Sequence, residues 1–203
     1  IYPSWDSKTP RHAILKDFFA ELQKNIKAER PEIILSADLF GYVANQGEDA
    51  TIGQRLTDIA PFFDYLSFMV YPSHYYAGLM VSADSVRNLP AVNYTVAEAR
   101  ANPDIVVGRS LLAALDFLNP AVASSTAASA KKGAGDMLQQ QATSAAVRPW
   151  LEDFFHEQDR LAGRPYGAQK VRMQIDAAEK SGGNGWLLWN ASNVYSESAL
   201  KKE

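Results

Sequence analysis

Four short apolar runs, separated by segments with helical spacing of apolar residues, most constrain what this chain can fold into. The runs cover residues 33–40, 65–71, 147–151 and 185–189, and glycine, proline or polar residues bound each of them. Runs of this length and composition are typical of parallel strands that are covered on both faces. Because no hairpin signal joins the runs, we predict βαβ units with right-handed crossovers.

The segments between the runs predict helices and one long loop. Thr9 is placed to act as an N-cap, and Pro10 to open an amphipathic helix that ends near Arg30. Further helices are expected where apolar residues recur at helical spacing, over residues 52–59, 104–118 and 168–180. Residues 72–102 are predicted to form a long irregular loop.

We predict one domain over residues 1–203, an α/β fold of the parallel (β/α)8 TIM-barrel type. The chain would supply roughly the last four β/α units, since a complete barrel domain needs about 250 residues. A small open α/β sheet is the alternative. Residues 121–146 are rich in Ala, Ser, Thr, Gln and Gly, and we expect a low-complexity insertion or excursion there. The chain begins at Ile1 without Met, which we interpret as a processed or truncated product.

Composition narrows the classes of partner and chemistry. The formal net charge is −3 and the basic residues are scattered, so nucleic acid is not an expected partner. The chain has no cysteine, which excludes disulfides and thiolate catalysis. We expect His12 and His156 at the surface, and no pair of histidines has metal-ligand spacing. No nucleotide-binding loop and no run of ~20 apolar residues is present. The sequence therefore predicts no metal site, no cofactor and no membrane span.

Alternation of side chains along the predicted strands brings polar and aromatic residues to one rim of the sheet. Asp38 ends the first strand on the face that it shares with Ser36, and Tyr71 ends the second strand on the same side. The later strands add further residues to this rim, namely Arg148, Trp150, Glu152 with Asp153 just beyond it, Asn190, and one of Trp186 and Trp189.

A rim of this composition suits a sugar. Cleavage of a glycosidic bond needs one carboxyl group to protonate the leaving oxygen and a second to act as nucleophile or to activate water. The apolar faces of sugars also stack on aromatic rings. The candidate catalytic residues are Asp38, Glu152 and Asp153. The candidate substrate-binding residues are Tyr71, His74, Tyr75, Arg148, Trp150, Trp189 and Asn190.

Each candidate also has a structural interpretation. Asp38 can cap the following turn or pair with Arg148. The aromatic residues of the segment 71–75 can pack around a rigid turn in which the histidine bonds the backbone. Glu152 and Asp153 are adjacent, so alternation lets only one of them face the rim, and either can be an exposed loop charge. A tryptophan on a buried strand is commonly part of the core.

Four stretches resemble a known bacterial family, the glycosyl hydrolase domains that were long classed as a domain of unknown function and are related to the α-amylase clan. They are SADLFGY at 36–42, DYLSFMVYPSHY at 64–75, RPWLEDF at 148–154 and GWLLWNASNVY at 185–195. The family usually has Gln at the position of Glu152, and the region from Met80 to Ala146 is longer here. In similar members a strand with an Asp-Tyr-x-Arg motif precedes the segment that matches Ile1, and its Asp is the expected second catalytic carboxylate.

The resemblance implies a TIM-barrel enzyme that hydrolyses O-glycosidic bonds of a polysaccharide, with Asp38 as the leading carboxylate in this chain. A non-catalytic carbohydrate-binding or cell-surface module on the same barrel is the second hypothesis. Either function places the protein outside the cytoplasm of a bacterium, secreted or in the cell envelope. Because half a barrel leaves strand edges unpaired, we expect this chain to associate with a missing N-terminal half or with a second copy.

Overall fold

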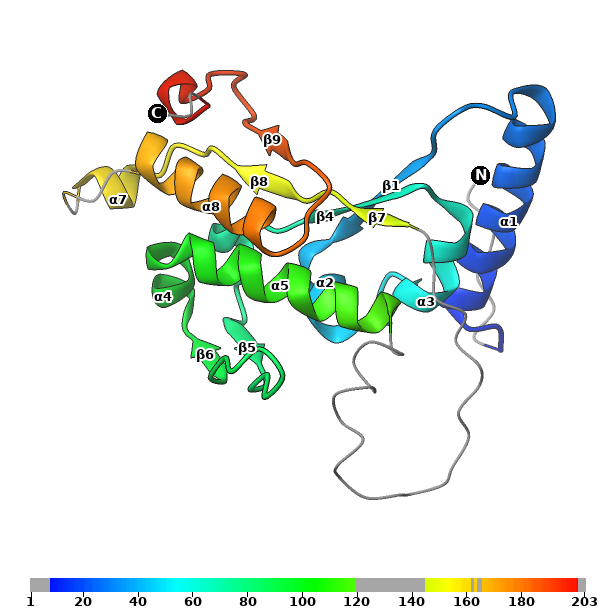
Figure 1. Cartoon of the computed structure of the whole chain (residues 1–203), viewed down its shortest axis with the longest axis horizontal. Helices are drawn as coiled ribbons and strands as arrows, with labels where there is room; N and C mark the ends of the chain where they lie inside the picture. Colours follow the sequence, from blue (N-terminus) through cyan, green and yellow to red (C-terminus); the bar gives the residue numbers. More distant parts are fainter. Residues whose placement is uncertain (1–7, 120–144, 162, 164–165, 201–203) are drawn as a thin grey trace.

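A computed structural model describes residues 8–119, 145–161, 163 and 166–200 (Figure 1). Its helices are α1 (Arg11–Glu29), α2 (Gly41–Gln46), α3 (Leu56–Ile59), α4 (Val96–Ala101), α5 (Pro103–Leu118), α7 (Glu157–Leu161), α8 (Ala168–Lys180) and the 3-10 turns η1 (Ala60–Phe62), η2 (Pro72–His74) and η3 (Glu197–Ala199). The main sheet contains β1 (Ser36–Phe40), β4 (Tyr65–Met69), β7 (Ala146–Val147), β8 (Trp150–Glu152) and β9 (Leu187–Trp189). Two short antiparallel pairs are β2 (Glu48–Asp49) with β3 (Gln54–Arg55), and β5 (Leu79–Val81) with β6 (Val92–Tyr94).

The main sheet is parallel throughout, in the order β1-β4-β8-β9, with β7 also beside β4. Phe40 of β1 lies opposite Met69 of β4, and Met69 lies opposite Trp150 of β8. Glu152 at the end of β8 lies opposite Trp189 of β9. The structure thus confirms a mixed α/β fold built on a parallel sheet.

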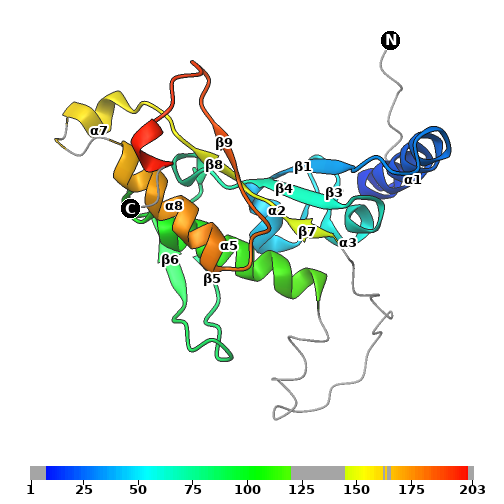
Figure 2. The same cartoon turned by 45° about the horizontal axis from the view of Figure 1, so that its top comes forward.

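One face of the sheet forms the core together with the helices. Leu66, Phe68 and Val70 are fully buried on this side, as their alternation predicted. Helices α5 and α8 pack against each other and lie side by side along the sheet in both views (Figures 1 and 2). Burial of such side chains contributes about 1.5–3 kcal/mol each relative to exposure.

The opposite face, called the open face below, carries Ser36, Asp38, Phe40, Ser67, Trp150 and Trp189. Asp38 is exposed, and Phe40 and Trp189 keep 49% and 44% of their surface accessible. In a parallel sheet buried on both sides, residues at these positions would be covered. Among the described residues β1 pairs only with β4 and β9 only with β8, so both edges of the sheet are open.

Gly41 connects β1 to α2 at a point where only glycine fits. A Cβ atom on Gly41 would lie 2.4 Å from the backbone oxygen of Met69, closer than carbon and oxygen can approach. The missing side chain lets the first turn of α2 contact the end of β4. The chain after β1 is therefore held against the neighbouring strand.

Several predicted elements differ from the observed ones. The N-cap position of α1 is Pro10, without a side-chain cap, so the prediction of Thr9 as N-cap was wrong. The predicted third strand is broken into β7 and β8 because Pro149 has no N–H with which to continue the ladder. Two short hairpins occupy the loops after β1 and β4, where the sequence showed no hairpin signal.

The loop predicted over residues 72–102 is more ordered than expected, since it contains η2, the β5–β6 hairpin and α4. Thr95 and Glu98 form a reciprocal capping box at the start of α4. Of the predicted insertion at residues 121–146, residues 121–144 lie outside the described part of the chain, and Ala146 begins β7. No helix in the described part of the chain is both long and apolar enough to cross a membrane.

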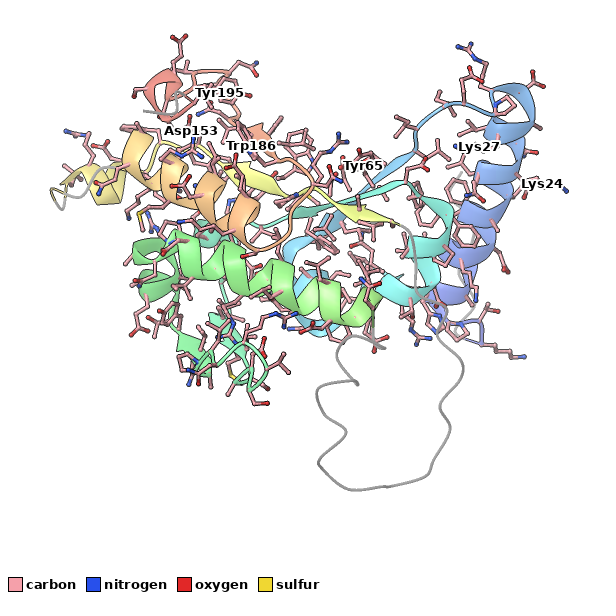
Figure 3. The ribbon with its side chains drawn as sticks, viewed as in Figure 1. Lys24, Lys27, Tyr65, Asp153, Trp186 and Tyr195 are labelled. Carbon is pink, nitrogen blue, oxygen red and sulfur yellow. The ribbon has the colours of Figure 1, made fainter. Side chains whose placement is uncertain are left out.

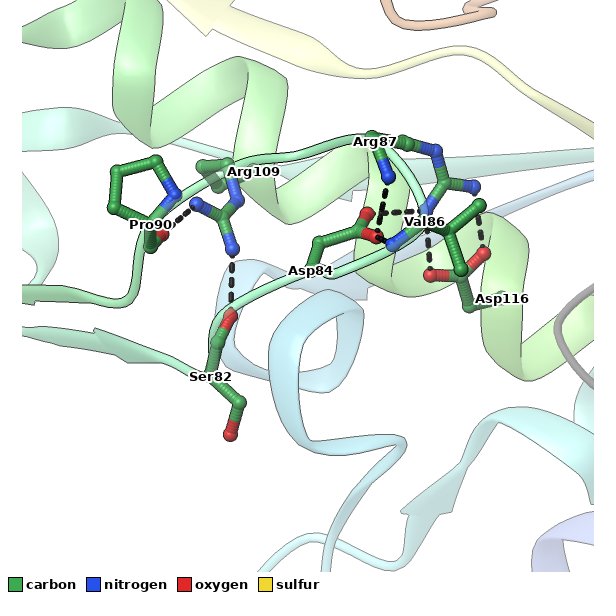
Figure 4. Close-up of polar contacts among 7 residues, drawn as sticks. All are labelled: Ser82, Asp84, Val86, Arg87, Pro90, Arg109 and Asp116. Carbon is green, nitrogen blue, oxygen red and sulfur yellow. Dashed lines mark hydrogen bonds and ion pairs between the residues drawn. The ribbon is translucent and has the colours of Figure 1, made fainter. Parts of the chain in front are cut away.

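Two arginines fasten the β5–β6 hairpin to α5 (Figure 4). Arg109 of α5 is buried and donates to the backbone oxygens of Ser82 (2.6 Å) and Pro90. Arg87 at the hairpin tip binds Asp116 of α5 through two nitrogens, at 2.7 and 2.9 Å, and also binds Asp84 at 2.6 Å. Charge-assisted, bidentate contacts of this kind are the strong class of hydrogen bond.

We predict that Arg109→Met lowers the free energy of unfolding by about 1–3 kcal/mol, because two carbonyls lose a charged donor. Urea denaturation followed by circular dichroism measures the change. Arg30→Met is the matched control, since Arg30 is exposed and forms an ion pair with exposed Glu32, and it should leave the transition midpoint in place. Equal midpoints for the two variants would contradict an anchoring role for Arg109.

Candidate functional site

The predicted rim residues lie along the strands of the parallel sheet and on the loops that follow them. Asp38 is the central residue of β1 and is the exposed carboxylate among them. The indole Nε1–H of Trp150 donates to Oδ1 of Asp38 at 2.9 Å, across the strand that separates them. In the described part of the chain Asp38 makes no ion pair with Arg148. Asp38 therefore keeps its second oxygen available at the open face.

Aromatic rings border Asp38 on the open face. Trp150 and Trp189 contact edge to face, with ring centroids 6.3 Å apart. Phe40 follows Asp38 by two residues on the same strand and is half exposed. Trp186 packs against the core instead, so Trp189 is the tryptophan of β9 that reaches this face. Exposed indole and phenyl faces beside a carboxylate suit the apolar faces of a sugar.

Arg148 neutralises no carboxylate among the described residues. Its guanidinium lies 4.4 Å from the ring centroid of Tyr65, a cation–π contact. Figure 3 shows Tyr65 on the side of the sheet away from α5. The Nε atom of Arg148 is buried without a hydrogen-bond partner. The geometry gives Arg148 an aromatic partner instead of the carboxylate that its sequence position suggested.

The segment after β4 places Tyr71 and His74 next to Phe154 of the segment after β8. The ring of Tyr71 lies 5.4 Å from that of His74 and 5.1 Å from that of Phe154. Burial raises the pKa of the Tyr71 phenol well above its ordinary value, and the charges of Asp38 and Glu152 raise it further. Tyr71 thus lies within the electrostatic reach of both carboxylates, on the rim where it was predicted.

Tyr75 lies in the core and not on the rim, which corrects its predicted role in substrate binding. It is only 2% exposed, and its hydroxyl bonds to the backbone oxygen of Gly41, to Ser110 and to Asn45. Burial raises the pKa of Tyr75 to about 12, partly offset by the bonds to Ser110 and Asn45. The 3-10 turn η2 reverses the chain after Tyr71, so strand alternation no longer applies at this position.

Glu152 is fully buried, which corrects the alternative of an exposed loop charge. Its Oε2 accepts hydrogen bonds from the backbone N–H and the hydroxyl of Ser73, at 3.0 and 2.7 Å. Its Oε1 lies 3.5 Å from Nε2 of His156. The expectation of a surface position for His156 was therefore wrong, because this ring packs between Phe154 and Tyr166.

Asp153 is also buried, and its carboxylate holds the loop after β9. Oδ2 accepts the backbone N–H of Ser196 at 2.6 Å, and Oδ1 accepts the Ser196 hydroxyl at 2.9 Å. Asn190 donates to the backbone oxygen of Asp153 and accepts the N–H of Ser192 at 2.7 Å. Figure 3 shows Asp153 and Tyr195 in the same region of the molecule. Asp153 and Asn190 thus shape the loops at the rim.

A hollow of about 660 Å³ lies beside these loops, within the size range of ligand pockets. It is bordered by Asp153, Phe154, Phe155, Tyr166, Asn190, Ala191, Ser192, Val194, Tyr195 and Ser196. Among the described residues, no group of three or more histidine or acidic side chains is arranged to hold a metal ion. The polar side chains that border the hollow, Asp153, Asn190, Ser192 and Ser196, come from the segments after β8 and β9.

The sequence reasoning missed Ser73, Phe154, His156 and Tyr166 as contributors to this region. Ser73 lies inside the stretch 64–75 that resembles the family, but no sequence pattern predicts which partner its hydroxyl bonds. His156 lies four residues after Glu152, and that spacing was a signal that could have been used.

We predict that the protein loses stability above about pH 10 because Tyr71 and Tyr75 hold their protons more tightly when folded than when unfolded. A tyrosine whose pKa is higher in the folded than in the unfolded protein stabilises the fold fully at any pH below its unfolded-state pKa. This stabilisation is lost as the pH rises from the unfolded-state pKa toward the folded-state pKa. The expected slope is about 1.4 kcal/mol per pH unit for each tyrosine. Urea unfolding from pH 8 to 11.5 should show a shallower slope for Tyr75→Phe. The exposed Tyr76 provides the control variant Tyr76→Phe, and equal slopes in both variants would count against this account.

Comparison with known proteins shows the family of this chain. No curated protein matches the chain. Among solved structures, the glycoside hydrolase domain of PgaB (BpsB) from Bordetella bronchiseptica is similar, with 12% sequence identity and a TM-score of 0.47. The match covers 89% of this chain and 37% of that one, so the chain spans well under half of that protein's length. A family model described as "Putative glycosyl hydrolase domain" matches residues 1–195, and the chain belongs to this family.

Proposed function

We propose that this chain is part of a glycoside hydrolase that cleaves O-glycosidic bonds of a polysaccharide, with Asp38 as a catalytic carboxylate. The observation that carries the proposal is the contrast among the three candidate carboxylates. Asp38 is exposed on the open face in the middle of β1 with one oxygen uncommitted, whereas Glu152 and Asp153 are buried and bonded to the protein. A group that reacts with substrate has to reach it.

The surroundings of Asp38 support this role. The Trp150 N–H bond to Oδ1 fixes the carboxylate and leaves Oδ2 to face a glycosidic oxygen or an anomeric carbon. Phe40 offers ring surface two residues further along β1, and Trp189 of β9 extends the aromatic surface through its contact with Trp150. Tyr71 and His74 lie in the segment after β4. Aromatic stacking would orient the sugar so that the carboxylate meets the scissile bond. Asn190 and Asp153 act in this proposal by holding the rim loops.

A second carboxyl group is required, about 5–10 Å from the first. We propose that it comes from a strand that pairs with the open edge of β1, in a complete (β/α)8 barrel of the α-amylase type. The two open sheet edges and the exposed aromatic residues of the open face support this closure. Active sites of such barrels lie at the carboxyl ends of the strands, and Asp38 is two residues from that end of β1.

A non-catalytic carbohydrate-binding or cell-surface module is the second candidate. The observation that favours it is the structural use of Glu152 and Asp153, since each bonds a loop of the protein. Both functions act on polysaccharides outside the cell, so we propose a secreted or cell-envelope location in a bacterium.

We predict that Asp38→Asn lowers the rate of polysaccharide hydrolysis by roughly 100-fold or more while substrate binding changes little, because the amide keeps the bond to Trp150 but cannot transfer a proton. Release of reducing ends from a panel of polysaccharides measures the rate in the complete protein. Glu48→Gln, at an exposed ion pair with Arg55, is the control and should retain activity. Binding without hydrolysis in both the unmodified protein and the variant would favour the second candidate.

We also predict that the 203-residue chain on its own self-associates at micromolar concentration through its open face and edges. Sedimentation velocity should show dimers or larger species, because exposed strand edges and apolar patches promote pairing. Phe40→Ser should shift the distribution toward monomer, and Phe155→Ser, a change at another exposed phenylalanine, should not. A monodisperse monomer that melts cooperatively would rule this out.

A further inference from the structure

Two buried atoms near the rim each lack a hydrogen-bond partner, and they face each other. Oε1 of Glu152 and Nε2 of His156 are both inaccessible to solvent and unbonded, at a separation of 3.5 Å. A buried acceptor left unsatisfied destabilises the fold, and does so more when it is charged. The two atoms are therefore each other's nearest candidate partners.

We infer that His156 donates a hydrogen bond from Nε2 to Oε1 of Glu152, and that the chain Ser73–Glu152–His156 positions the Tyr71–His74 segment at the sugar-binding rim. A shift of a few tenths of an ångström brings the two atoms within bonding distance. Ser73 already directs two donors at Oε2, so Oε1 is the oxygen that is left for His156. Glu152 and His156 are positioning residues in this arrangement.

The His156 ring is held where it can make this bond. Its centroid lies 6.0 Å from the ring of Phe154 and 5.2 Å from the ring of Tyr166, both edge to face. These contacts restrict rotation of the imidazole, so Nε2 stays directed at Glu152. The side chain of Tyr166 is in turn capped by the ammonium group of Lys170, 5.1 Å from its ring centroid.

The bond connects two loops of the rim. Ser73 belongs to η2, which follows Tyr71 and ends at His74, while His156 follows β8. Phe154 touches the rings of both Tyr71 and His74. Glu152 is thus the shared anchor beneath the two loops. A displaced anchor would move both side chains that the proposed function assigns to substrate binding, and to that extent the inference rests on the proposed function.

Nitrogen-15 NMR of the full chain tests the bond without any assay of activity. Two-bond correlations show which ring nitrogens carry protons in His12, His74 and His156. We expect a proton on Nε2 of His156. In Glu152→Gln the amide oxygen takes the bonds from Ser73 and the amide N–H faces the imidazole, so the proton should move to Nδ1. A bare Nε2 in the unmodified protein, or an unchanged pattern in Glu152→Gln, would overturn the inference.

The same spectrum contains its own control. Nδ1 of His12 lies 2.9 Å from Oδ2 of Asp58, so a protonated Nδ1 at His12 verifies that the method detects a carboxylate partner. Glu152→Gln should leave the His12 signals in place, because that pair lies on α1 and α3.

Oligosaccharide binding by the complete protein tests the link to the rim. His156→Phe keeps the ring packing but removes the donor, and we expect Kd to rise roughly tenfold, the equivalent of one hydrogen bond. His12→Phe is the matched control and should bind as the unmodified protein does. An unchanged Kd in His156→Phe would overturn the positioning role. If the unmodified protein binds no oligosaccharide, the proposed function fails while the NMR result still decides the bond.

Discussion

The pairing of β4 on both of its edges is the interaction on which the remainder of this structure depends. β4 bonds to β1 on one side and to β7 and β8 on the other, and its buried side chains Leu66 and Phe68 pack in the core. Backbone groups of a buried strand have to find partners, because an unbonded N–H or C=O is costly away from water. The parallel direction of these pairs then brings all the strand ends, and the loops that follow them, to one rim.

Burial divides the acidic residues of the rim into two kinds. Asp38 lies on the open face, where water or a ligand can reach it, and it receives one bond from an indole. Glu152 and Asp153 lie beneath loops, where each carboxylate oxygen needs a protein donor. A buried charge without such donors would be strongly destabilising. The same residue type therefore serves as a candidate reactive group in one place and as a loop anchor in another.

Much of the fold was predictable from local pattern. The helix over Ala168–Lys180 begins and ends as its periodicity indicated, and Leu66, Phe68 and Val70 face the core as alternation required. Alternation also placed Asp38 on the face opposite the core. The assignment of Tyr75 to the rim failed because η2 turns the chain before that residue, and a turn of this kind has no period that can be extrapolated.

By itself the sequence determined the elements that repeat: roughly where the strands of the main sheet and the long helices lie, which of their faces is apolar, and that Asp38 faces away from the core. These follow from local spacing, since a side chain's direction in a regular element depends only on its position along that element. Only the tertiary structure decided that Glu152 meets Ser73 and His156, that Arg148 lies over Tyr65, and that Tyr75 enters the core. Such contacts depend on how loops fold back across the sheet, and no local pattern encodes the partner that a side chain finds there.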